Sequence, residues 1–416
     1  MKVLWITNIL FDHHKAMVGQ DPTVVTGGSW LNAAYNASLN NKDIHLYVAT
    51  SGVNKVLLES SKDGNMFYIV PGGYNCSYDI HSEVNYKNWK CLRDLVQPDL
   101  VVIWGTESRF SYVAMKAMKG VPMLIYMQGV MQSICQHFYD GVPQRYRCAT
   151  IRDVVDRLNP KSTYNSFQAQ VPLEKEMLQM ASGVIVENDW CEDMCKSVNP
   201  KLIIFRNNLP IREVFRSREW KLDTIEPCSI FTNAGGYPIK GHHILFQAIA
   251  LVKNTFPNVK CYVPGEKLSV YAGVKRQTGY TKMLNELINK YNLHDNIIYT
   301  GRLTSDEMVD YICKSNVYVM PSVMENHSSS LIEAMMLGAP SIGSLVGGTA
   351  SLIKHCHNAI LYNCLDPYSL AGNIIRVFQD DLFAIKLSSN AIKVREDRVE
   401  NFGEDMIRIY SQLLNS

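Results

Sequence analysis

Residues 321–340 read PSVMENHSSSLIEAMMLGAP, and this stretch decides the fold. It follows the apolar run 317–320, which is typical of a buried strand. Serines 328–330 offer an N-cap, the next seven residues are good helix formers, and Gly338 with Pro340 is typical of a helix end. The stretch therefore predicts a strand, a loop and a capped helix, the unit from which parallel α/β sheets are built.

The start of that helix, near Ser328, is a candidate anion-binding site. Backbone N–H groups without helical partners, together with the helix dipole, attract a diphosphate there. Glu325 precedes the helix and Glu333 lies inside it, so we expect their carboxylates to accept hydrogen bonds from sugar hydroxyls and ribose hydroxyls, respectively. Glu396 and Glu404 have the same spacing but lack the strand, the turn and the Gly-x-Pro stop, so we interpret them as solvated charge.

Short apolar runs alternate with segments of helical length along the whole chain, a pattern typical of parallel strands joined by crossover helices. Strands are predicted in the first half at residues 3–8, 44–50, 66–70, 100–104, 123–127 and 183–187. The pattern restarts at 229–233, 260–263, 296–300, 317–320 and 340–343. Because 416 residues exceed the size of one ordinary core, we predict two Rossmann-like α/β domains facing each other across a cleft.

Two connecting segments complete the predicted architecture. Residues 205–226 interrupt regular structure with Asn207, Asn208 and Pro210 before a charged stretch, so the join and hinge are expected there. The C-terminal segment 391–416 has one apolar helix face, formed by Phe402, Met406, Ile409, Tyr410 and Leu413. That face either packs on the second domain or returns to the first.

Composition narrows the class of protein. Hydrophobic residues make up 47% and charged residues 19%, which is typical of a folded soluble protein. The formal net charge of +2 creates no global field that would attract nucleic acid. The apolar start is too short for a signal peptide, and the apolar run 121–131 falls short of the roughly 20 residues of a membrane-spanning helix. We therefore expect a cytoplasmic protein without nucleic-acid partners.

A basic stretch between Arg145 and Lys161 leaves one question of location open. It holds five basic residues against two acidic ones. A solvated helix face is the ordinary interpretation, and weak peripheral contact with anionic lipid at the inner face of the membrane, or with a charged acceptor, is the alternative.

No metal or cofactor is expected. The eleven histidines include no pair with plausible metal-ligand spacing, and the eleven cysteines include no Cys-x-x-Cys pair. Gly27 and Gly28 follow the first strand and let the backbone approach a phosphate or sugar closely. They do not form Gly-x-Gly-x-x-Gly, which argues against a nicotinamide enzyme.

The motif of residues 321–348 resembles that of retaining glycosyltransferase family 4, the glycogen-synthase-like group 1 glycosyltransferases of GT-B fold. The shared features are the Pro-Ser turn, Glu325, the Glu-Ala-Met that begins at Glu333, the Gly-x-Pro stop and the Gly347-Gly348 loop. The resemblance implies Lys240 and Glu325 as catalytic residues. The donor-binding residues that we predict are Gly27, Gly28, Gly301, Arg302, Asn326, His327, Ser328, Ser329, Leu331 and Glu333.

The sequence departs from the family pattern at two positions. The family commonly has an arginine five residues before the lysine, whereas this chain has Gly235, so another cation substitutes or turnover is modest. Gln128 stands where many relatives have a histidine that faces the donor sugar. Glutamine can hydrogen-bond to the sugar or acceptor but cannot act as a general base, because it does not titrate. Glu107, at the end of another strand, either contacts the sugar or acceptor or has a structural role.

The resemblance implies transfer of a hexosyl group from a UDP- or GDP-sugar to an acceptor hydroxyl, with retained configuration and without a metal. A glycan or lipid-linked sugar in cell-surface polysaccharide synthesis is the implied acceptor. The predicted domains are 1–208 on the acceptor side, 209–390 on the nucleotide-sugar side and the helical segment 391–416. A nucleotide-sugar epimerase of similar architecture and an inactive nucleotide-binding module remain the alternatives.

Overall fold

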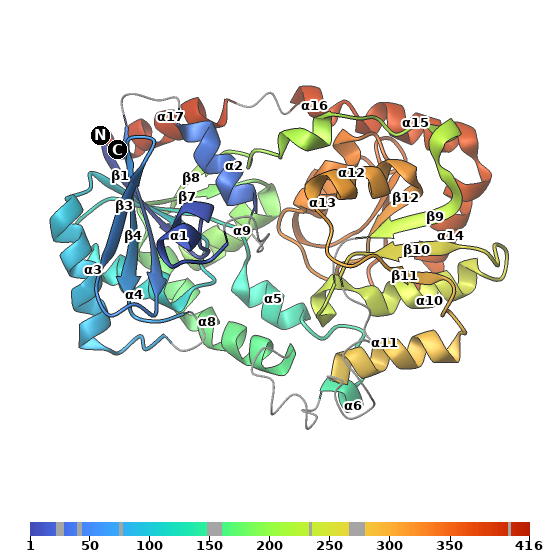
Figure 1. Cartoon of the computed structure of the whole chain (residues 1–416), viewed down its shortest axis with the longest axis horizontal. Coiled ribbons are helices and arrows are strands. Elements are labelled where there is room, and N and C mark those ends of the chain that lie inside the picture. Colours follow the sequence, from blue (N-terminus) through green and yellow to red (C-terminus); the bar gives the residue numbers. More distant parts are fainter. Residues whose placement is uncertain are drawn as a thin grey trace. The chain divides into compact units, whose positions relative to one another are not determined.

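A computed structural model describes residues 1–21, 29–39, 44–74, 78–147, 160–232, 235–265, 279–397 and 401–416. The chain divides into two compact units (Figure 1). The first unit comprises Met1–Gln132, Ser166–Pro210 and Glu400–Ser416, and the second comprises Ser133–Asn165 and Ile211–Val399. The passage from the first unit to the second between Pro210 and Ile211 falls inside the predicted join at 205–226.

The first unit is built on a sheet whose strands, within the described residues, run in the order β3-β4-β2-β1-β5-β6-β7-β8. All neighbouring strands pair in parallel except β3, which is antiparallel to β4. The strands are β1 (Lys2–Thr7), β2 (His45–Gly52), β3 (Leu58–Lys62), β4 (Asn65–Pro71), β5 (Leu100–Trp104), β6 (Met123–Tyr126), β7 (Gly183–Val186) and β8 (Ile203–Arg206). The six predicted strands are confirmed, and the two edge strands β3 and β8 were not predicted.

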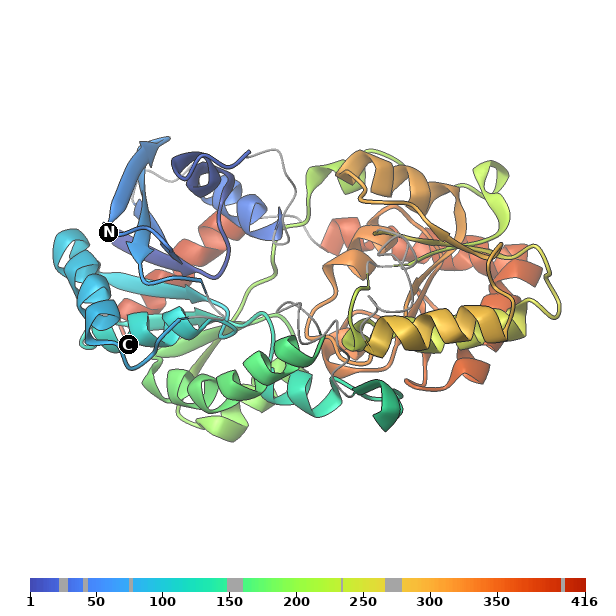
Figure 2. The same ribbon diagram turned by 60° about the horizontal axis from the view of Figure 1, so that its bottom comes forward.

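Helices cover both faces of this sheet (Figures 1 and 2). They are α1 (Asp12–Met17), α2 (Ser29–Ser38), α3 (Glu83–Val96), α4 (Arg109–Ala117), α5 (Met131–His137), α8 (Pro160–Met180), α9 (Asp189–Val198) and α17 (Phe402–Leu414), of which α5 and α8 each cross a boundary between the units. Two apolar clusters, one on each side of the sheet, form the core because alternate strand residues such as Leu4 and Trp5 point to opposite faces.

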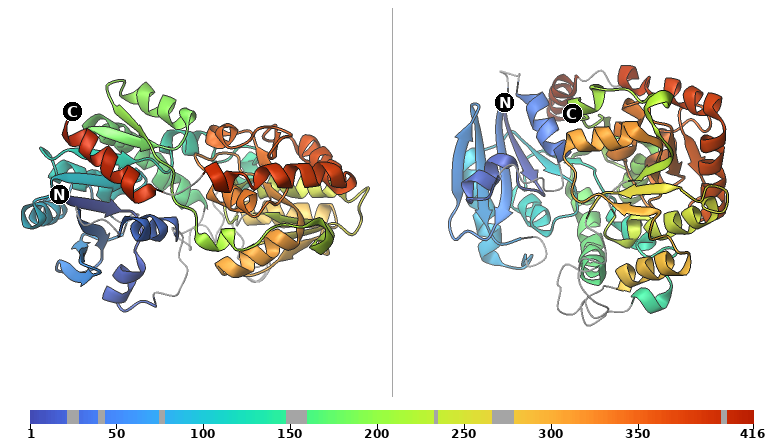
Figure 3. Two further views of the ribbon diagram at one scale, coloured as in Figure 1. Left: turned by 90° about the horizontal axis from the view of Figure 1, so that it is seen from above. Right: turned by 45° about the vertical axis from the view of Figure 1, so that its right-hand side comes forward.

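The C-terminal helix α17 belongs to the first unit, where it packs beside α2 (Figure 3). Its buried residues are Phe402, Met406, Ile409, Tyr410 and Leu413, the same apolar face that the sequence predicted. The indole Nε1 of Trp5 donates a hydrogen bond to the Tyr410 hydroxyl at 3.0 Å. Of the two placements that the sequence left open, the structure has the return to the first unit.

The second unit contains a parallel sheet with the order β11-β10-β9-β12-β13-β14 in the described part of the chain. The strands are β9 (Glu226–Thr232), β10 (Lys260–Val263), β11 (Ile297–Tyr299), β12 (Ser315–Met320), β13 (Ser341–Ser344) and β14 (Ile360–Tyr362). The surrounding α-helices are α6 (Gln144–Arg147), α10 (His242–Val252), α11 (Gly279–Lys290), α12 (Ser305–Lys314), α13 (Ser329–Met336), α14 (Pro367–Gln379), α15 (Asp381–Ala391) and α16 (Val394–Asp397). The predicted second sheet is therefore present, with β14 as an additional edge strand.

Within the described residues, 133–147 and 160–165 pack with the second unit, although the predicted first domain, 1–208, includes them. Helix α6 lies along α11, and the Tyr146 hydroxyl donates a hydrogen bond to the Glu286 carboxylate. The His243 ring nitrogen Nε2 lies 2.9 Å from the Asp140 carbonyl oxygen. Helical periodicity identifies which face of a segment is apolar but not which sheet will cover it, so the sequence did not reveal this exchange.

Candidate functional site

Helix α13 has the capped start that the motif predicted. Ser328 is the N-cap, and its hydroxyl accepts a hydrogen bond from the Leu331 backbone N–H at 3.4 Å. Ser329 and Ser330 are partly exposed, whereas Leu331 is fully buried. The first turn is therefore accessible only at Ser329 and Ser330, because the N-cap Ser328 is 4% exposed. Leu331 has its side chain in the core, so its part in donor binding is limited to the backbone.

The loop before α10 packs closely against the loop that follows β12. Gly241 has φ +70°, and a Cβ added there would lie 1.8 Å from the Pro321 carbonyl oxygen. The Val323 N–H donates to the Ile239 carbonyl at 2.8 Å. Only glycine permits both the left-handed backbone and this close approach, so the Lys240-Gly241 pair fixes the lysine beside the motif.

The Gly347-Gly348 loop holds the other side of Glu325. Gly347 has φ +45°, and a Cβ added there would lie 2.0 Å from the Glu325 carbonyl oxygen. That carbonyl accepts a hydrogen bond from the Gly348 N–H at 3.1 Å. Loops that follow β9, β12 and β13 therefore meet at the carboxyl edge of the sheet, where open parallel sheets bind their ligands.

Lys240 and Glu325, the predicted catalytic pair, are in direct contact. The Lys240 Nζ lies 2.7 Å from the Glu325 Oε1, which also accepts a hydrogen bond from the Ser322 hydroxyl at 2.8 Å. Burial lowers the pKa of Lys240, but the adjacent Glu325 carboxylate and Tyr237 together raise it by more, so the pKa lies above its usual value. With 25% of its side chain exposed, Lys240 is a charged donor that a ligand can still reach.

Glu333 is paired with Arg212, which is not among the predicted site residues. The Arg212 Nε and Nη2 lie 3.0 and 2.7 Å from the Glu333 Oε1, and the Nη1 donates to the Ser305 hydroxyl at 2.7 Å. Burial raises the pKa of Glu333, and the Arg212 guanidinium offsets part of this rise. Nothing in the sequence near either residue indicated a partner 121 residues away.

The other predicted donor-binding residues differ in accessibility. Gly301 is partly exposed at the end of β11 and exchanges backbone hydrogen bonds with Gly265, and Arg302 beside it is exposed. Asn326 is buried and His327 is partly exposed in the loop before α13. Gly27 and Gly28 lie outside the described residues, as do residues 148–159 of the basic stretch.

His242 occupies the space beside Gly235, the position at which the family commonly has arginine. A Cβ added to Gly235 would lie 2.5 Å from the His242 Nε2. His242 is itself 1% exposed at the first position of α10. The imidazole therefore fills the space that the first carbon of a side chain at position 235 would occupy.

Restoring the arginine with Gly235→Arg should destabilise the protein, because the new side chain must displace the His242 ring. Overpacking of this kind costs about 1–3 kcal/mol, so we expect Tm to fall by several degrees and activity not to rise. Thermal denaturation checks this, with Gly236→Arg as the matched control because a Cβ there meets nothing within 4 Å. Equal Tm values for the two variants would contradict the packing argument.

In the first unit, Glu107 and Gln128 follow neighbouring strands. Glu107 comes after β5, and its Oε1 accepts a hydrogen bond from the Gly129 N–H at 2.6 Å. Burial raises the pKa of Glu107 to about 7. Gln128 follows β6 and is partly buried next to Gly129. Both lie at the carboxyl edge of their sheet.

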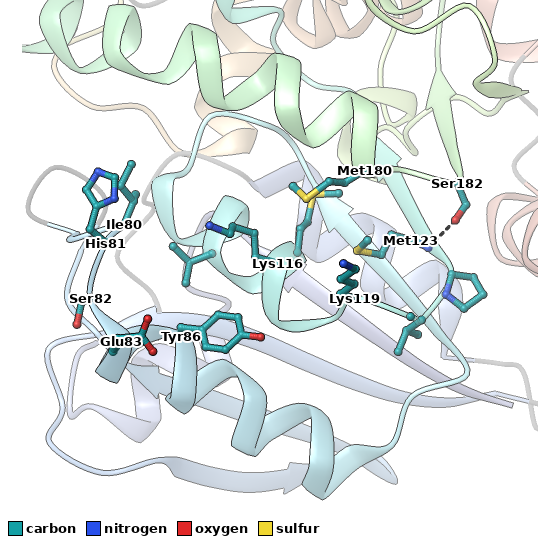
Figure 4. A pocket seen from close by; sticks show the side chains of 15 residues that line it. Ile80, His81, Ser82, Glu83, Tyr86, Lys116, Lys119, Met123, Met180 and Ser182 are labelled. Atoms are coloured by element: carbon teal, nitrogen blue, oxygen red, sulfur yellow. Dashed lines mark hydrogen bonds between the residues drawn. The ribbon is translucent and has the colours of Figure 1, made fainter.

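A cavity of about 990 Å³ in the first unit lies at the opposite edge of the sheet (Figure 4). It is lined near the amino ends of β6 and β7 by Met123 and Ser182, whose hydroxyl accepts a hydrogen bond from the Met123 N–H at 3.2 Å. Lys116 and Lys119 are exposed at its rim. Since ligands of open parallel sheets bind at the carboxyl ends of strands, we do not assign this cavity to the candidate site.

The described ranges contain neither a metal-binding cluster nor a membrane-spanning helix. No group of three or more His, Cys, Asp or Glu side chains there could hold a metal ion. None of the helices described is both long and apolar enough to cross a membrane.

Two α/β units, each built on a largely parallel sheet covered by helices, are typical of the GT-B class of protein. Among solved structures, sucrose-phosphate synthase from Thermosynechococcus elongatus matches with a TM-score of 0.71 and 17% identity over 100% of both chains. Anabaena HepE in complex with UDP-glucose matches with a TM-score of 0.66 and 15% identity over 99% of this chain and 100% of that chain. The predicted fold class is confirmed.

Residues 220–394 match the family described as glycosyl transferases group 1, so the chain carries a domain of this family, as the resemblance implied. A D-inositol 3-phosphate glycosyltransferase of Streptomyces bingchenggensis is 29% identical over 171 residues, which cover 40% of this chain and 36% of that protein. An N-acetyl-alpha-D-glucosaminyl L-malate synthase of Bacillus anthracis is 25% identical over 122 residues, covering 29% and 31%. The match spans about a third of the length of these relatives.

Proposed function

We propose that this protein is a retaining hexosyltransferase that moves a hexosyl group from a nucleotide-diphosphate sugar to an acceptor hydroxyl. The observation that carries the proposal is the contact of Lys240 with Glu325 beside the start of α13, inside a glycosyltransferase group 1 domain. A cation and backbone N–H groups at a helix start can bind a diphosphate, and a carboxylate can accept hydrogen bonds from sugar hydroxyls.

The difficult step of this reaction is departure of the nucleoside diphosphate. The bond from the anomeric carbon to the phosphate oxygen breaks, the acceptor oxygen bonds to that carbon, and the acceptor proton goes to the leaving phosphate on the same face. Lys240 donates one N–H to Glu325, so two remain for phosphate oxygens. Preorganised donors of this kind stabilise the developing charge without a metal ion.

Glu325 and Glu333 have different tasks in the proposed complex. Glu325 is fixed by Lys240 and Ser322 and would orient the sugar through its hydroxyls. Glu333 would accept hydrogen bonds from the ribose, while Arg212 holds the carboxylate in place. The first carboxylate therefore sets the position of the reacting carbon and the second sets the position of the nucleoside.

The proposal extends to the substrates and the setting. We infer a UDP- or GDP-sugar donor and a glycan or lipid-linked sugar acceptor in polysaccharide biosynthesis, in the cytoplasm or peripherally at the inner face of the membrane. The related fold of HepE was solved with UDP-glucose, which supports a nucleotide-sugar donor.

A thermal-shift panel of UDP, GDP and their hexose conjugates tests the proposal. A ligand at 100 times its Kd adds about 2.7 kcal/mol of stability, so one nucleotide series should raise Tm measurably. The chosen donor should release nucleotide diphosphate only when an acceptor is present, and EDTA should leave that rate unchanged. Epimerised donor in the absence of acceptor would favour an epimerase. Nucleotide binding without turnover would favour an inactive module. Loss of activity with EDTA would favour a metal-dependent enzyme.

A further inference from the structure

The cavity of about 990 Å³ in the first unit shares no residue with the candidate site and is bounded by four segments (Figure 4). They are the chain at the start of α3, helix α4, the turn between α4 and β6, and the connection from α8 to β7. All of its lining residues belong to the first unit. Sites for small molecules commonly have volumes of about 300–1,000 Å³, so the cavity is large enough for a ligand.

Hydrogen bonds within the first unit hold the walls of the cavity in place. The Arg93 Nη1 of α3 donates to the Ala117 carbonyl, at the end of α4, at 2.9 Å. The Ser182 N–H donates to the Met123 carbonyl at 2.8 Å, and the Met123 N–H donates to the Ser182 hydroxyl at 3.2 Å. A ligand would therefore meet a largely preformed cavity, which lowers the entropic cost of binding.

The floor of the cavity is apolar. Val113, Met115 and Met123 are buried there as part of the core on one side of the sheet. Val121 and Met180 are half-buried and pack against the same core. Methionine side chains adapt their shape to what contacts them, so an unbranched apolar chain can pack on this floor.

The polar side chains of the lining are of two kinds. Ser82 caps α3 by accepting the Asn85 N–H at 3.3 Å, and Ser182 bonds to the start of β6, so both serines already have partners. Lys116 and Lys119 are exposed, and neither forms an ion pair with any residue that the structure describes. The unused hydrogen-bond donors of the cavity are therefore cationic.

The charge at the rim favours an anion. Figure 4 shows Glu83 and Tyr86 of α3 on one side of the cavity and the two lysines across from them. Glu83 lies in the first turn of α3, where the helix dipole stabilises negative charge. The Lys116 Nζ lies 5.3 Å from the centre of the Tyr112 ring, and an aromatic face leaves its positive charge in place. Two lysines thus outnumber one glutamate, whose charge is already stabilised by its own helix.

We propose that this cavity binds a free anionic amphiphile, with its apolar chain on the methionine floor and its carboxylate or phosphate beside Lys116 and Lys119. A sugar or nucleoside would bring many hydroxyl groups to a floor of apolar side chains, where they would lose hydrogen bonds to water. A cavity receives a whole molecule, whereas a bilayer is contacted by a projecting surface, so the assigned occupant is a free molecule. The inference goes beyond the proposed function and does not depend on it.

Isothermal titration calorimetry of the full chain at pH 7.5 tests this inference. The probes are octanoate, decanoate and octyl phosphate, all below the concentrations at which they form micelles. The chain alone is represented by 1-octanol and the anion alone by inorganic phosphate, and octanoate and octyl phosphate should bind at least tenfold more tightly than either. Decanoate should bind roughly 15-fold more tightly than octanoate, because each buried methylene contributes about fourfold.

Substitutions at the rim should change the affinity in opposite directions. Lys116→Gln with Lys119→Gln should weaken octanoate binding roughly tenfold, since each ion pair at an exposed site contributes about fivefold or less. Glu83→Gln should tighten it about two- to fivefold, because it removes the one acidic side chain among the described residues that line the cavity. A gain in affinity cannot result from misfolding. Lys201→Gln and Glu59→Gln change exposed residues elsewhere in the first unit and should leave the affinity unchanged.

Met180→Gln tests the floor. The side chain is half-buried, and glutamine has nearly the same length, so the protein should stay folded, which thermal denaturation checks. Octanoate and decanoate should bind several-fold more weakly, because the chain loses an apolar contact. Unchanged binding of both probes would show that the chain does not lie on this floor.

UDP and lipid vesicles distinguish this site from other locations. Saturating UDP should not displace octanoate, and displacement would place octanoate in the candidate site and overturn the inference. Binding to vesicles of phosphatidylglycerol and phosphatidylcholine, without binding of any free probe, would show a membrane-binding surface instead. Equal affinities for 1-octanol and octanoate, an unchanged affinity in the double lysine variant, or binding of no probe at all would also overturn it. Failure of UDP to bind would defeat the proposed function and leave this inference standing.

Discussion

Lys240→Met should lower kcat by roughly 10²–10³, the usual loss when one preorganised donor to a developing charge is removed. Lys240 precedes the Gly241 turn, which lies against Pro321, and its Nζ lies 2.7 Å from Glu325, so the lysine is positioned beside the motif. Methionine keeps most of the side-chain volume and removes the charge. Donor affinity should fall as well, because the lysine also contacts the ground-state diphosphate. Steady-state kinetics with the donor chosen by thermal shift measure both effects.

A matched control and a double variant refine that experiment. Lys290→Met changes an exposed lysine of α11 in the same unit and should keep full activity. Lys240→Met combined with Glu325→Gln removes both charges, which separates loss of phosphate binding from the cost of leaving Glu325 without its cation. Full activity in Lys240→Met would show that the phosphate binds elsewhere.

Arg212→Met should be the most destabilising of these substitutions, by about 3–5 kcal/mol, because it leaves the Glu333 carboxylate buried without its cation. Only 7% of the Glu333 side chain is exposed, and both Arg212 contacts are to one of its oxygens. The substitution should also weaken donor binding, since the carboxylate loses the group that orients it. Thermal denaturation and the nucleotide thermal shift report the two effects separately.

A second substitution, Glu333→Gln, added to Arg212→Met tests whether the stability is lost because the Glu333 carboxylate has no cation. Arg212→Met with Glu333→Gln should recover much of the lost stability but not the donor affinity. Arg218→Met is the surface control, because Arg218 pairs with Asp310 where 58% and 52% of the side chains are exposed, and such pairs contribute about 1 kcal/mol or less. Equal stability losses in Arg212→Met and Arg218→Met would contradict the assigned burial of the pair.

Local chemistry made the motif predictable. The serine cap, the helix formers and the Gly-x-Pro stop act within twenty residues of sequence, and the observed helix starts at Ser329 after an N-cap at Ser328. The buried strands were also predictable, because each is a short apolar run of neighbouring residues. The edge strand β3 has the sequence LESSK, whose polar, largely exposed side chains carry no apolar run to recognise.

Long-range pairing was not predictable. The Arg212 to Glu333 contact joins the charged stretch after the join with a helix 121 residues later, and no periodicity encodes that choice. The inclusion of residues 133–147 and 160–165 in the second unit depends on contacts such as that between Tyr146 and Glu286, separated by 140 residues. The sequence indicated which faces are apolar, while tertiary packing decided what covers them.

The alternation of the two units along the chain has a consequence for biosynthesis. Translation releases the first unit's strands early, but the face that receives α17 stays uncovered until residues 402–414 leave the ribosome. Trp5 meets its partner Tyr410 only after 405 further residues. Nascent chains expose apolar surface for as long as such contacts are missing, and at bacterial or eukaryotic elongation rates of about 5–20 residues per second that interval lasts roughly 20–80 s. The emerging polypeptide is therefore a natural client for chaperones that shield hydrophobic segments during synthesis.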